Sequence, residues 1–542
     1  MPQVRHASSG ETLTEKNQQE AVKGDAPYLN KKGYIDFKPD DPENPQNWST
    51  GRRTGITLIV ILLVLNATFA SSAISGAFES VVKHFRVSLT AAGLTVTLFL
   101  LGYCAGPLFF APLSEVYGRR WIFIITFALY SVFNLLCAFA PNYGALLVGR
   151  LITGTLVSAP LSNAPGVLAD VWNPIERGTA MAGFAASIWA GSAMGPVVGG
   201  FILLKKDWRW VFYTQMFLAA GTCALMAFLP ETHAPTLLRQ KARRIRQAGI
   251  SGFENVKAAA DDQDRSLQSV FKIALTRPWI ILFDTIALLC AIYLSVVYTL
   301  LYMLFDIYPI VFEFKRGWLP GVAELPLLGT IVGCVIGGFI IVVETRKRGN
   351  KIKRGEKTMA DYTPEDRLPL AMYGGVGFSV AMFWFSWTGH YNSIHWIVPT
   401  LAGVLLSISL LLVFVAFLNY IVDTYVMYAA SAIAANTIVR SACGAAAPLF
   451  TPQMFVAMGV GPGGSVIGGV AALLAVIPFL FYKYGKQIRE RSKFSPANSK
   501  PPPPPKPEDQ EAAVMPSDRS STERDSTEHK DTTHAVEWPR IC

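Results

Sequence analysis

The sequence predicts an all-α polytopic membrane protein with twelve transmembrane helices in two bundles of six. Of its 542 residues, 51% are hydrophobic and only 16% are charged, whereas soluble domains carry about 25% charged residues. Six apolar segments hold no charged side chain, and each has about the 20 residues that a helix needs to cross a bilayer. The short alternating segments of a membrane β-barrel are absent from the sequence. Helical spans are therefore expected.

The twelve predicted spans follow one another along most of the chain. They cover residues 55–75, 91–113, 121–140, 144–170, 179–204, 211–230, 278–305, 319–343, 367–388, 394–420, 425–449 and 460–482. A polar loop divides them into two groups of six. The predicted organisation is an N-terminal cytosolic tail (1–54), a first six-helix bundle (55–230), a cytosolic central loop (231–277), a second six-helix bundle (278–484) and a disordered cytosolic tail (485–542).

The positions of the basic residues predict which loops face the cytosol. Cytoplasmic loops of membrane proteins carry an excess of Lys and Arg. The loops after the even-numbered spans hold Arg119, Arg120, Arg177 and a basic run within 346–357, whereas residues 141–143 hold none. Both termini are therefore predicted to be cytosolic. The same placement accounts for the net charge of +10, so no nucleic-acid partner is expected.

The seven cysteines do not form a recognisable site. Six of them lie inside apolar segments, and the sequence has no C-x-x-C pair and no His/Cys cluster. We therefore predict no metal site and no catalytic site.

The loop after the second span combines a carboxylate, a tight glycine turn and two arginines. These residues are Glu115, Gly118, Arg119 and Arg120. An ion pair that forms in one conformation and breaks in another would act as a conformational latch. The alternative is that these charges only set the topology of the chain.

Span four contains an arginine about six residues from its start, Arg150. A charged side chain within the bilayer is costly unless it faces a cavity or a partner, which makes Arg150 a functional candidate. The alternative is that its side chain extends toward the nearer membrane surface.

Span five contains a stripe of small residues interrupted by a proline. The stripe consists of Gly191, Gly195, Pro196, Gly199 and Gly200. Glycines at this spacing expose the backbone on one helix face, and the proline bends the helix. A sliding contact or hinge is predicted, with a plain packing interface as the alternative.

Few other polar residues lie within the spans. Asp284 and Glu324 are candidates for proton coupling, because a proton carrier must titrate while facing each side in turn; both lie near span ends, so a surface carboxylate is the alternative. A substrate pocket between the two halves would draw on polar and aromatic side chains, which suit flat organic solutes. The candidates are Asn66, Tyr293, Tyr298, Tyr302 and Trp384.

The chain resembles the major facilitator superfamily, and within it the fungal drug:H⁺ antiporters with twelve spans. The loop after span two, Arg150 with Gly154, and the span-five stripe are similar to three signatures of that superfamily. Further segments typical of the fungal group are residues 41–49, 207–212, 230–232, 364–368, 419–425 and 434–441. The resemblance covers about residues 40–490. Glu115 replaces the usual Asp of the loop signature, and the equivalent turn after span eight is degenerate.

This resemblance implies a major facilitator fold, with two bundles that rock about a central site. It implies a proton-coupled exporter of amphipathic organic compounds such as drugs, toxins or fungal secondary metabolites. The proton gradient would supply the energy, without a cofactor. The expected partners are the small substrate, protons and the lipid bilayer, and the expected state is a monomer in the plasma membrane, with the vacuolar membrane as the alternative.

Other functions remain as alternatives at this stage. An uptake carrier for a small nutrient is disfavoured by the span-five glycines. A membrane enzyme would need a His/Asp or Ser/His constellation, which the sequence does not show, and a transporter-like receptor would rely on longer cytosolic tails. We therefore expect that the chain is not an enzyme.

Overall fold

The structure is a computed structural model. It describes residues 28–30, 33–173, 176–248, 253, 255–262, 266–356, 358, 361–425, 428–492 and 494. The predicted disordered tail begins at residue 485, but residues 485–491 are helical and end α18 (Val476–Arg491), so this boundary is wrong. From position 495 onward the tail lies outside the described residues, as does the start of the predicted N-terminal tail. The described residues form helices with two isolated β-bridges and no strand, which confirms the all-α prediction.

The helices before the central segment correspond to the first six predicted spans. They are α2 (Thr50–Ser72), α3 (Phe78–Phe85), α4 (Leu89–Tyr117), α5 (Arg119–Ala138), α6 (Tyr143–Val171), α7 (Arg177–Leu203) and α8 (Arg209–Met226). The central segment contributes α9 (Ala234–Gln247) and α10 (Leu267–Leu282). We call α2–α8 the first half of the molecule.

The second half follows the central segment. It consists of α11 (Thr285–Tyr308), the π-helix Pro309–Phe314, α12 (Pro320–Ala323), α13 (Leu328–Lys353), α14 (Leu368–His390), α15 (Ile397–Tyr425), α16 (Ala429–Met458), α17 (Val460–Leu474) and α18 (Val476–Arg491). The predicted start of span seven at residue 278 is wrong, because residues 278–282 belong to α10 and the chain breaks at Phe283 and Asp284.

Eleven helical stretches among the described residues are long and apolar enough to cross a membrane. The sixth predicted span corresponds to α8, which is not among them. This helix has 18 residues, and its apolar character is reduced by Arg209 and Gln215. Helix α8 packs against α5, so it occupies a place within the first half beside a membrane-length helix.

Local sequence signals set several helix ends. Ser88 accepts a hydrogen bond from the N–H of Ala91 at the start of α4, and Asn142 does the same for Ala145 at the start of α6. Gly118 separates α4 from α5 with a φ of 94°, in the left-handed region that favours glycine. We use these loops to name the two ends of the bundle: the Gly118 end and the Asn142 end.

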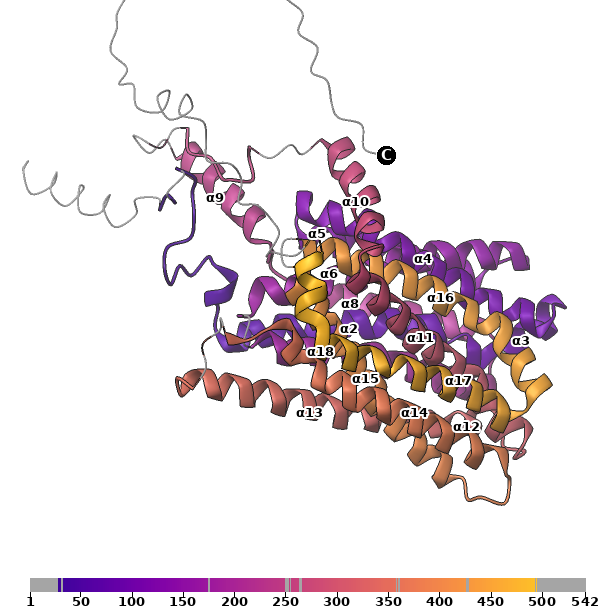
Figure 1. Cartoon of the computed structure of the whole chain (residues 1–542). Helices are drawn as coiled ribbons and strands as arrows, with labels where there is room; N and C mark the ends of the chain where they lie inside the picture. The colour runs from indigo at the N-terminus through magenta and orange to yellow at the C-terminus, as the bar shows by residue number, and fades with distance from the viewer. Residues whose placement is uncertain are drawn as a thin grey trace, which may run out of the picture. The chain divides into compact units, whose positions relative to one another are not determined.

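The two halves contact each other mainly through α4 with α16 and α7 with α13, and α4 lies beside α16 in Figure 1. Toward the Asn142 end, the Thr97 hydroxyl donates to the Ala445 carbonyl at 2.8 Å, and an added Cβ at Gly200 would lie 3.0 Å from Gly321. Toward the Gly118 end, an added Cβ at Gly178 would lie 2.9 Å from Thr345. The halves therefore touch toward both ends of the bundle.

The described part of the N-terminal segment packs against α9. Ile35 is buried in a small cluster with Ala242 of α9, and Lys241 lies 2.7 Å from Asp41. Burial alone would raise the pKa of Asp41, but its hydrogen bonds with Lys241 and with backbone N–H groups outweigh burial, and the pKa is lowered. This part of the predicted tail is therefore attached to the central segment.

Candidate functional site

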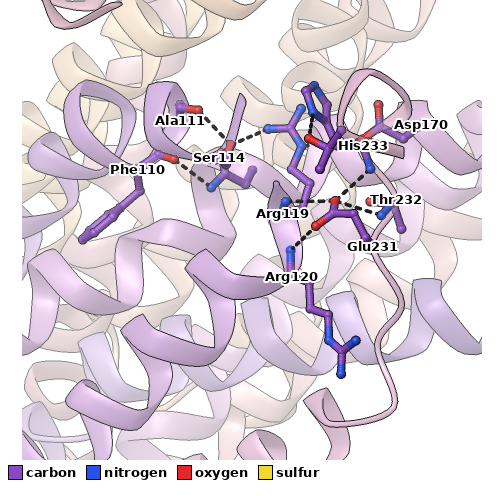
Figure 2. Close-up of polar contacts among 11 residues, drawn as sticks. Phe110, Ala111, Ser114, Arg119, Arg120, Asp170, Glu231, Thr232 and His233 are labelled. Carbon is purple, nitrogen blue, oxygen red and sulfur yellow. Dashed lines mark hydrogen bonds and ion pairs between the residues drawn. The ribbon is translucent and has the colours of Figure 1, made fainter. Parts of the chain in front are cut away.

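The turn between α4 and α5 is held by a carboxylate from outside the predicted motif, Glu231 (Figure 2). Its Oε1 accepts from the backbone N–H of Arg119 at 3.0 Å, and its Oε2 accepts from that of Arg120 at 3.2 Å. The first N–H groups of a helix have no partner within the helix and carry partial positive charge. Glu231 therefore caps the N-terminus of α5. An added Cβ at Gly118 would lie 2.3 Å from Oε2, so a side chain at this position would displace the capping carboxylate.

The guanidinium of Arg119 joins three helices of the first half. Its Nη1 donates to the Ser114 hydroxyl on α4 at 2.6 Å, and its Nε lies 3.5 Å from Asp170 on α6. Ser114 in turn donates to the side chain of Asn163 on α6 at 3.1 Å. Figure 2 shows Arg119 between Ser114 and Asp170. The charge cluster thus fixes the Gly118 end of α4, α5 and α6.

The predicted latch residue Glu115 makes no direct ion pair with this cluster, although its carboxylate is within electrostatic range of Arg119. Its side chain is exposed, and it takes part in none of the ion pairs found within the described ranges. In this conformation Arg119 is paired with Asp170 instead. Glu231 was not predicted as a partner because it is distant in the chain, although an acidic residue directly after span six is a usable signal.

Arg150 is completely buried, and each nitrogen of its guanidinium donates to a backbone carbonyl. Nε donates to Thr95 at 2.9 Å, and Nη1 and Nη2 donate to Ala70 at 3.1 Å. Nη2 also donates to Ser71 at 3.2 Å. The Ala70 and Ser71 carbonyls belong to the last turn of α2, whose C-terminal end carries partial negative charge, and the Thr95 carbonyl belongs to α4. Arg150 therefore ties α6 to α2 and α4, and does not extend to the membrane surface.

The glycine stripe of α7 faces mainly α2 within the same half. An added Cβ at Gly191 would lie 2.2 Å from the Thr68 hydroxyl, and one at Gly195 would lie 2.1 Å from the Ser72 hydroxyl. Gly199 meets the Ala73 carbonyl in the same way at 2.2 Å. Of the stripe, Gly200 faces the second half, at Gly321 of α12. The close approach of α2 and α7 therefore depends on these glycines.

The predicted pocket residues do not come together. Asn66 donates to the Thr222 hydroxyl at 3.1 Å inside the first half, and Trp384 is 38% exposed. Of the three predicted tyrosines, all of them buried in α11, Tyr298 and Tyr302 are in ring contact, and the Tyr302 hydroxyl lies 2.9 Å from that of Ser71 across the two halves. Tyr293 packs instead on Phe417.

The two predicted carboxylates lie at opposite ends of α11. Asp284 precedes the helix at the Gly118 end and accepts a hydrogen bond from the Tyr425 hydroxyl. Glu324 follows α12 at the other end and is only 3% exposed. Glu324 is therefore buried, and the alternative that it is a surface carboxylate is wrong.

A second carboxylate, Asp306 of α11, accompanies Glu324. Both line a cavity of about 90 Å³, together with Glu79 and Glu313, and its walls come from both halves, including Gly76 and Leu203. One carboxylate oxygen of each, Oδ2 of Asp306 and Oε2 of Glu324, is buried without a hydrogen-bond partner among the described residues. Asp306 was missed because it falls one residue beyond the predicted span 278–305, although a lone acidic residue between apolar neighbours is a usable signal.

Arg440 of α16 lines a small space between the halves. It was not among the predicted site residues. Helices α6 and α7 of the first half and α15 and α16 of the second line this space of about 10 Å³. A lone arginine within predicted span eleven could have been selected by the same argument as Arg150. Within the described ranges, no group of His, Cys, Asp and Glu could hold a metal ion.

Comparison with known proteins gives consistent results. The sequence profile of the Major Facilitator Superfamily matches residues 60–448. Efflux pump FUBT of Fusarium oxysporum is 40% identical over 464 residues, which are 85% of this chain and 77% of that protein. The major facilitator superfamily multidrug transporter mdrA of Aspergillus fumigatus is 38% identical over 459 residues, 84% of this chain and 75% of that protein.

A solved structure shares the fold. The proton:xylose symporter XylE, bound to 6-bromo-6-deoxy-D-glucose, aligns with a TM-score of 0.59 at 18% identity. The alignment covers 81% of this chain and 96% of that chain. At this identity the match bears on the fold alone.

Proposed function

The chain belongs to the major facilitator superfamily, and from that premise we propose that it is a proton-coupled efflux transporter. It would export amphipathic organic compounds such as drugs, toxins or fungal secondary metabolites. The names of its relatives from Fusarium oxysporum and Aspergillus fumigatus support the direction of transport. The multiple membrane-length helices make it a multi-pass membrane protein that carries a small molecule.

The observation that carries proton coupling is the pair of carboxylates between the halves. An ionised carboxylate without a partner is costly to remove from water. Glu324 is almost completely buried, and it shares its cavity with Asp306. Closing this end of the bundle would therefore favour protonation of the pair. Opening it would let water reach both carboxylates and let them exchange protons with that side.

The direction of coupling follows from the proposed topology. The basic loops favour a cytosolic location for the Gly118 end and both termini, and in this topology the Asp306 and Glu324 cavity would face the outside. The carrier would take up protons from the outside when this end opens, and it would close around the protonated pair. Opening of the Gly118 end would then let water reach the pair along the space between the halves, and the protons would leave to the cytosol, so that protons move inward while solute leaves.

The physical cycle would be a rocking of the two halves about the space near Arg440. Toward the Asn142 end, Gly200 against Gly321 and Thr97 against Ala445 would separate when the carrier opens outward. The contact of Gly178 with Thr345 would separate when it opens to the cytosol. Rearrangement of packed interfaces of this kind underlies alternating access. We further propose that the transporter acts as a monomer in the plasma membrane.

The test is transport in reconstituted vesicles. Purified full-length chain is placed in liposomes loaded with a panel of fluorescent amphipathic compounds, and the pH difference across the membrane is set in either direction. We expect release to be faster when the receiving side is acidic and to lose this dependence when a protonophore is added. If no compound in a broad panel moves under either gradient, the proposal is wrong. Movement of solute toward the alkaline side, in the same direction as the protons, would instead indicate an uptake carrier.

A further inference from the structure

Arg440 is buried in the second half with unused hydrogen-bond donors. The residue is only 4% exposed. Its Nε and Nη1 atoms are buried and have no hydrogen-bond partner among the described residues. It also belongs to none of the ion pairs in that part of the chain. A buried cation whose donors are unsatisfied is costly, so its retention calls for a partner that this conformation lacks.

Arg150 shows what a structural arginine looks like in the same molecule. It is equally buried, but each of its three guanidinium nitrogens donates to a backbone carbonyl. These hydrogen bonds within the protein compensate for the burial of the Arg150 charge. Arg440 has no equivalent set of acceptors, so the same explanation does not apply to it.

Aromatic rings hold the Arg440 guanidinium in place. Its central carbon lies 4.9 Å from the Tyr298 ring centroid and 5.0 Å from that of Phe414. Cation–π contacts of this kind stabilise the charge through the face of the group. The N–H donors lie in the plane of the guanidinium, so these contacts leave the donors available.

The available donors line the space between the halves. Asn436 precedes Arg440 by one helical turn on α16, and residues at this spacing share a helix face. Its Nδ2 is also buried without a hydrogen-bond partner among the described residues. Both residues line the space with apolar side chains from the first half, such as Leu161 and Phe184. The unpartnered donors of Arg440 and Asn436 therefore lie beside apolar side chains of the first half.

The space itself is closed in this conformation. Its volume of about 10 Å³ is close to the minimum for a single water molecule. A solute can reach Arg440 only after the two halves move apart. The lining comes from both halves, so such a movement would open the space rather than bury it further.

We infer that Arg440 anchors an anionic group of the exported solute, a carboxylate on an otherwise apolar, ring-bearing molecule, and that Asn436 donates beside it. The guanidinium matches a carboxylate in a bidentate geometry, with two parallel hydrogen bonds. The apolar lining and the aromatic rings suit the body of such a solute. This inference rests on the proposed function and narrows its substrate to organic acids.

The test measures binding of three probes that share one ring system and differ in charge. The probes are 2-naphthoate, 2-naphthamide and 2-naphthylmethylammonium, titrated calorimetrically into the purified full-length chain. We expect naphthoate to bind at least about tenfold more tightly than the other two, as a charge-assisted hydrogen bond permits. Equal or weaker binding of naphthoate would overturn the inference. Competition by acetate or chloride as strong as that by naphthoate would indicate an adventitious ion only, and would overturn it too.

Two variants locate the effect at Arg440. Arg440→Gln should weaken naphthoate binding about tenfold or more and abolish the preference over naphthamide. Arg440→Lys keeps the charge but not the bidentate geometry, so it should retain part of the preference and serves as the test if the glutamine variant does not fold. Arg243→Gln removes an exposed arginine of α9 and should leave binding unchanged. Unaltered naphthoate binding in a folded Arg440→Gln protein would refute the assignment.

Transport of the same probes separates this inference from the proposed function. If vesicles export naphthylmethylammonium under a pH difference while naphthoate shows no binding preference, the anion site is wrong and the efflux function stands. If naphthoate binds through Arg440 but no probe is transported, the anion site stands and the efflux function is contradicted.

Discussion

Two buried arginines, Arg150 and Arg440, differ in what their N–H groups contact. The sequence predicts that Arg150 lies inside a span, because no charged neighbour surrounds it within the apolar segment. It does not predict that the acceptors are carbonyls of Ala70 and Ser71, since those depend on where α2 ends against α6. The location of a charged residue is thus readable from the chain, while its partner is set by the packing of distant helices.

The partner of the Gly118 turn, Glu231, is likewise distant in the chain and was not predicted. Its contribution to stability can be tested by a single substitution. Replacing Glu231 by Gln removes the charge that caps α5 at Arg119 and Arg120. We expect this to cost about 1–2 kcal/mol of stability, because charge-assisted bonds to a helix N-terminus are lost. The readout is the melting temperature of the detergent-purified protein. Glu115→Gln is the matched control and should change it less, since Glu115 forms none of the ion pairs found among the described residues; a larger loss for Glu115→Gln than for Glu231→Gln would contradict this assignment.

At the scale of elements, the sequence locates long helices well and their breaks poorly. Apolar length is a property of the segment itself, so eleven of the twelve predicted spans correspond to stretches of membrane length. The break before α11 at Phe283 and Asp284 and the extension of α13 to Lys353 were not predicted. Breaks of this kind depend on tertiary contacts, which apolar length does not encode.

The glycine stripe of α7 gives a prediction at this scale. Gly195→Ala would place a Cβ 2.1 Å from the Ser72 hydroxyl and 2.7 Å from the Ala73 backbone nitrogen. Because backbone cannot move aside cheaply, we expect a destabilisation of about 1–3 kcal/mol, measured as a lower melting temperature.

The control for this substitution lies on α8. Gly221→Ala meets no atom within 4 Å and should be neutral or stabilise its helix, since alanine favours helix by roughly 1 kcal/mol. A Gly195→Ala protein as stable as the Gly221→Ala protein would show that α2 and α7 are not as closely packed as described.

At the scale of the whole molecule, the two halves enclose the carboxylates Asp306 and Glu324 toward the Asn142 end. They also enclose Arg440, which has N–H donors without a hydrogen-bond partner among the described residues. Sequence reasoning found one member of the pair, Glu324, but placed it among possible surface residues; it missed Asp306. The reason is that a cavity between halves is formed by segments far apart in the chain, here Gly76, Leu203 and residues of α11 and α12. The three-dimensional arrangement alone makes Asp306 and Glu324 neighbours.

Proton coupling through this pair is the central claim of the account. The most direct measurement records the internal pH of vesicles, with a trapped indicator, while an outward gradient of transported solute is imposed. The wild-type chain should move protons inward as solute leaves. A chain with Asp306→Asn and Glu324→Gln should release solute down its gradient without any change in pH. Proton movement that is undiminished in the double variant, or absent from the wild type, would contradict the claim.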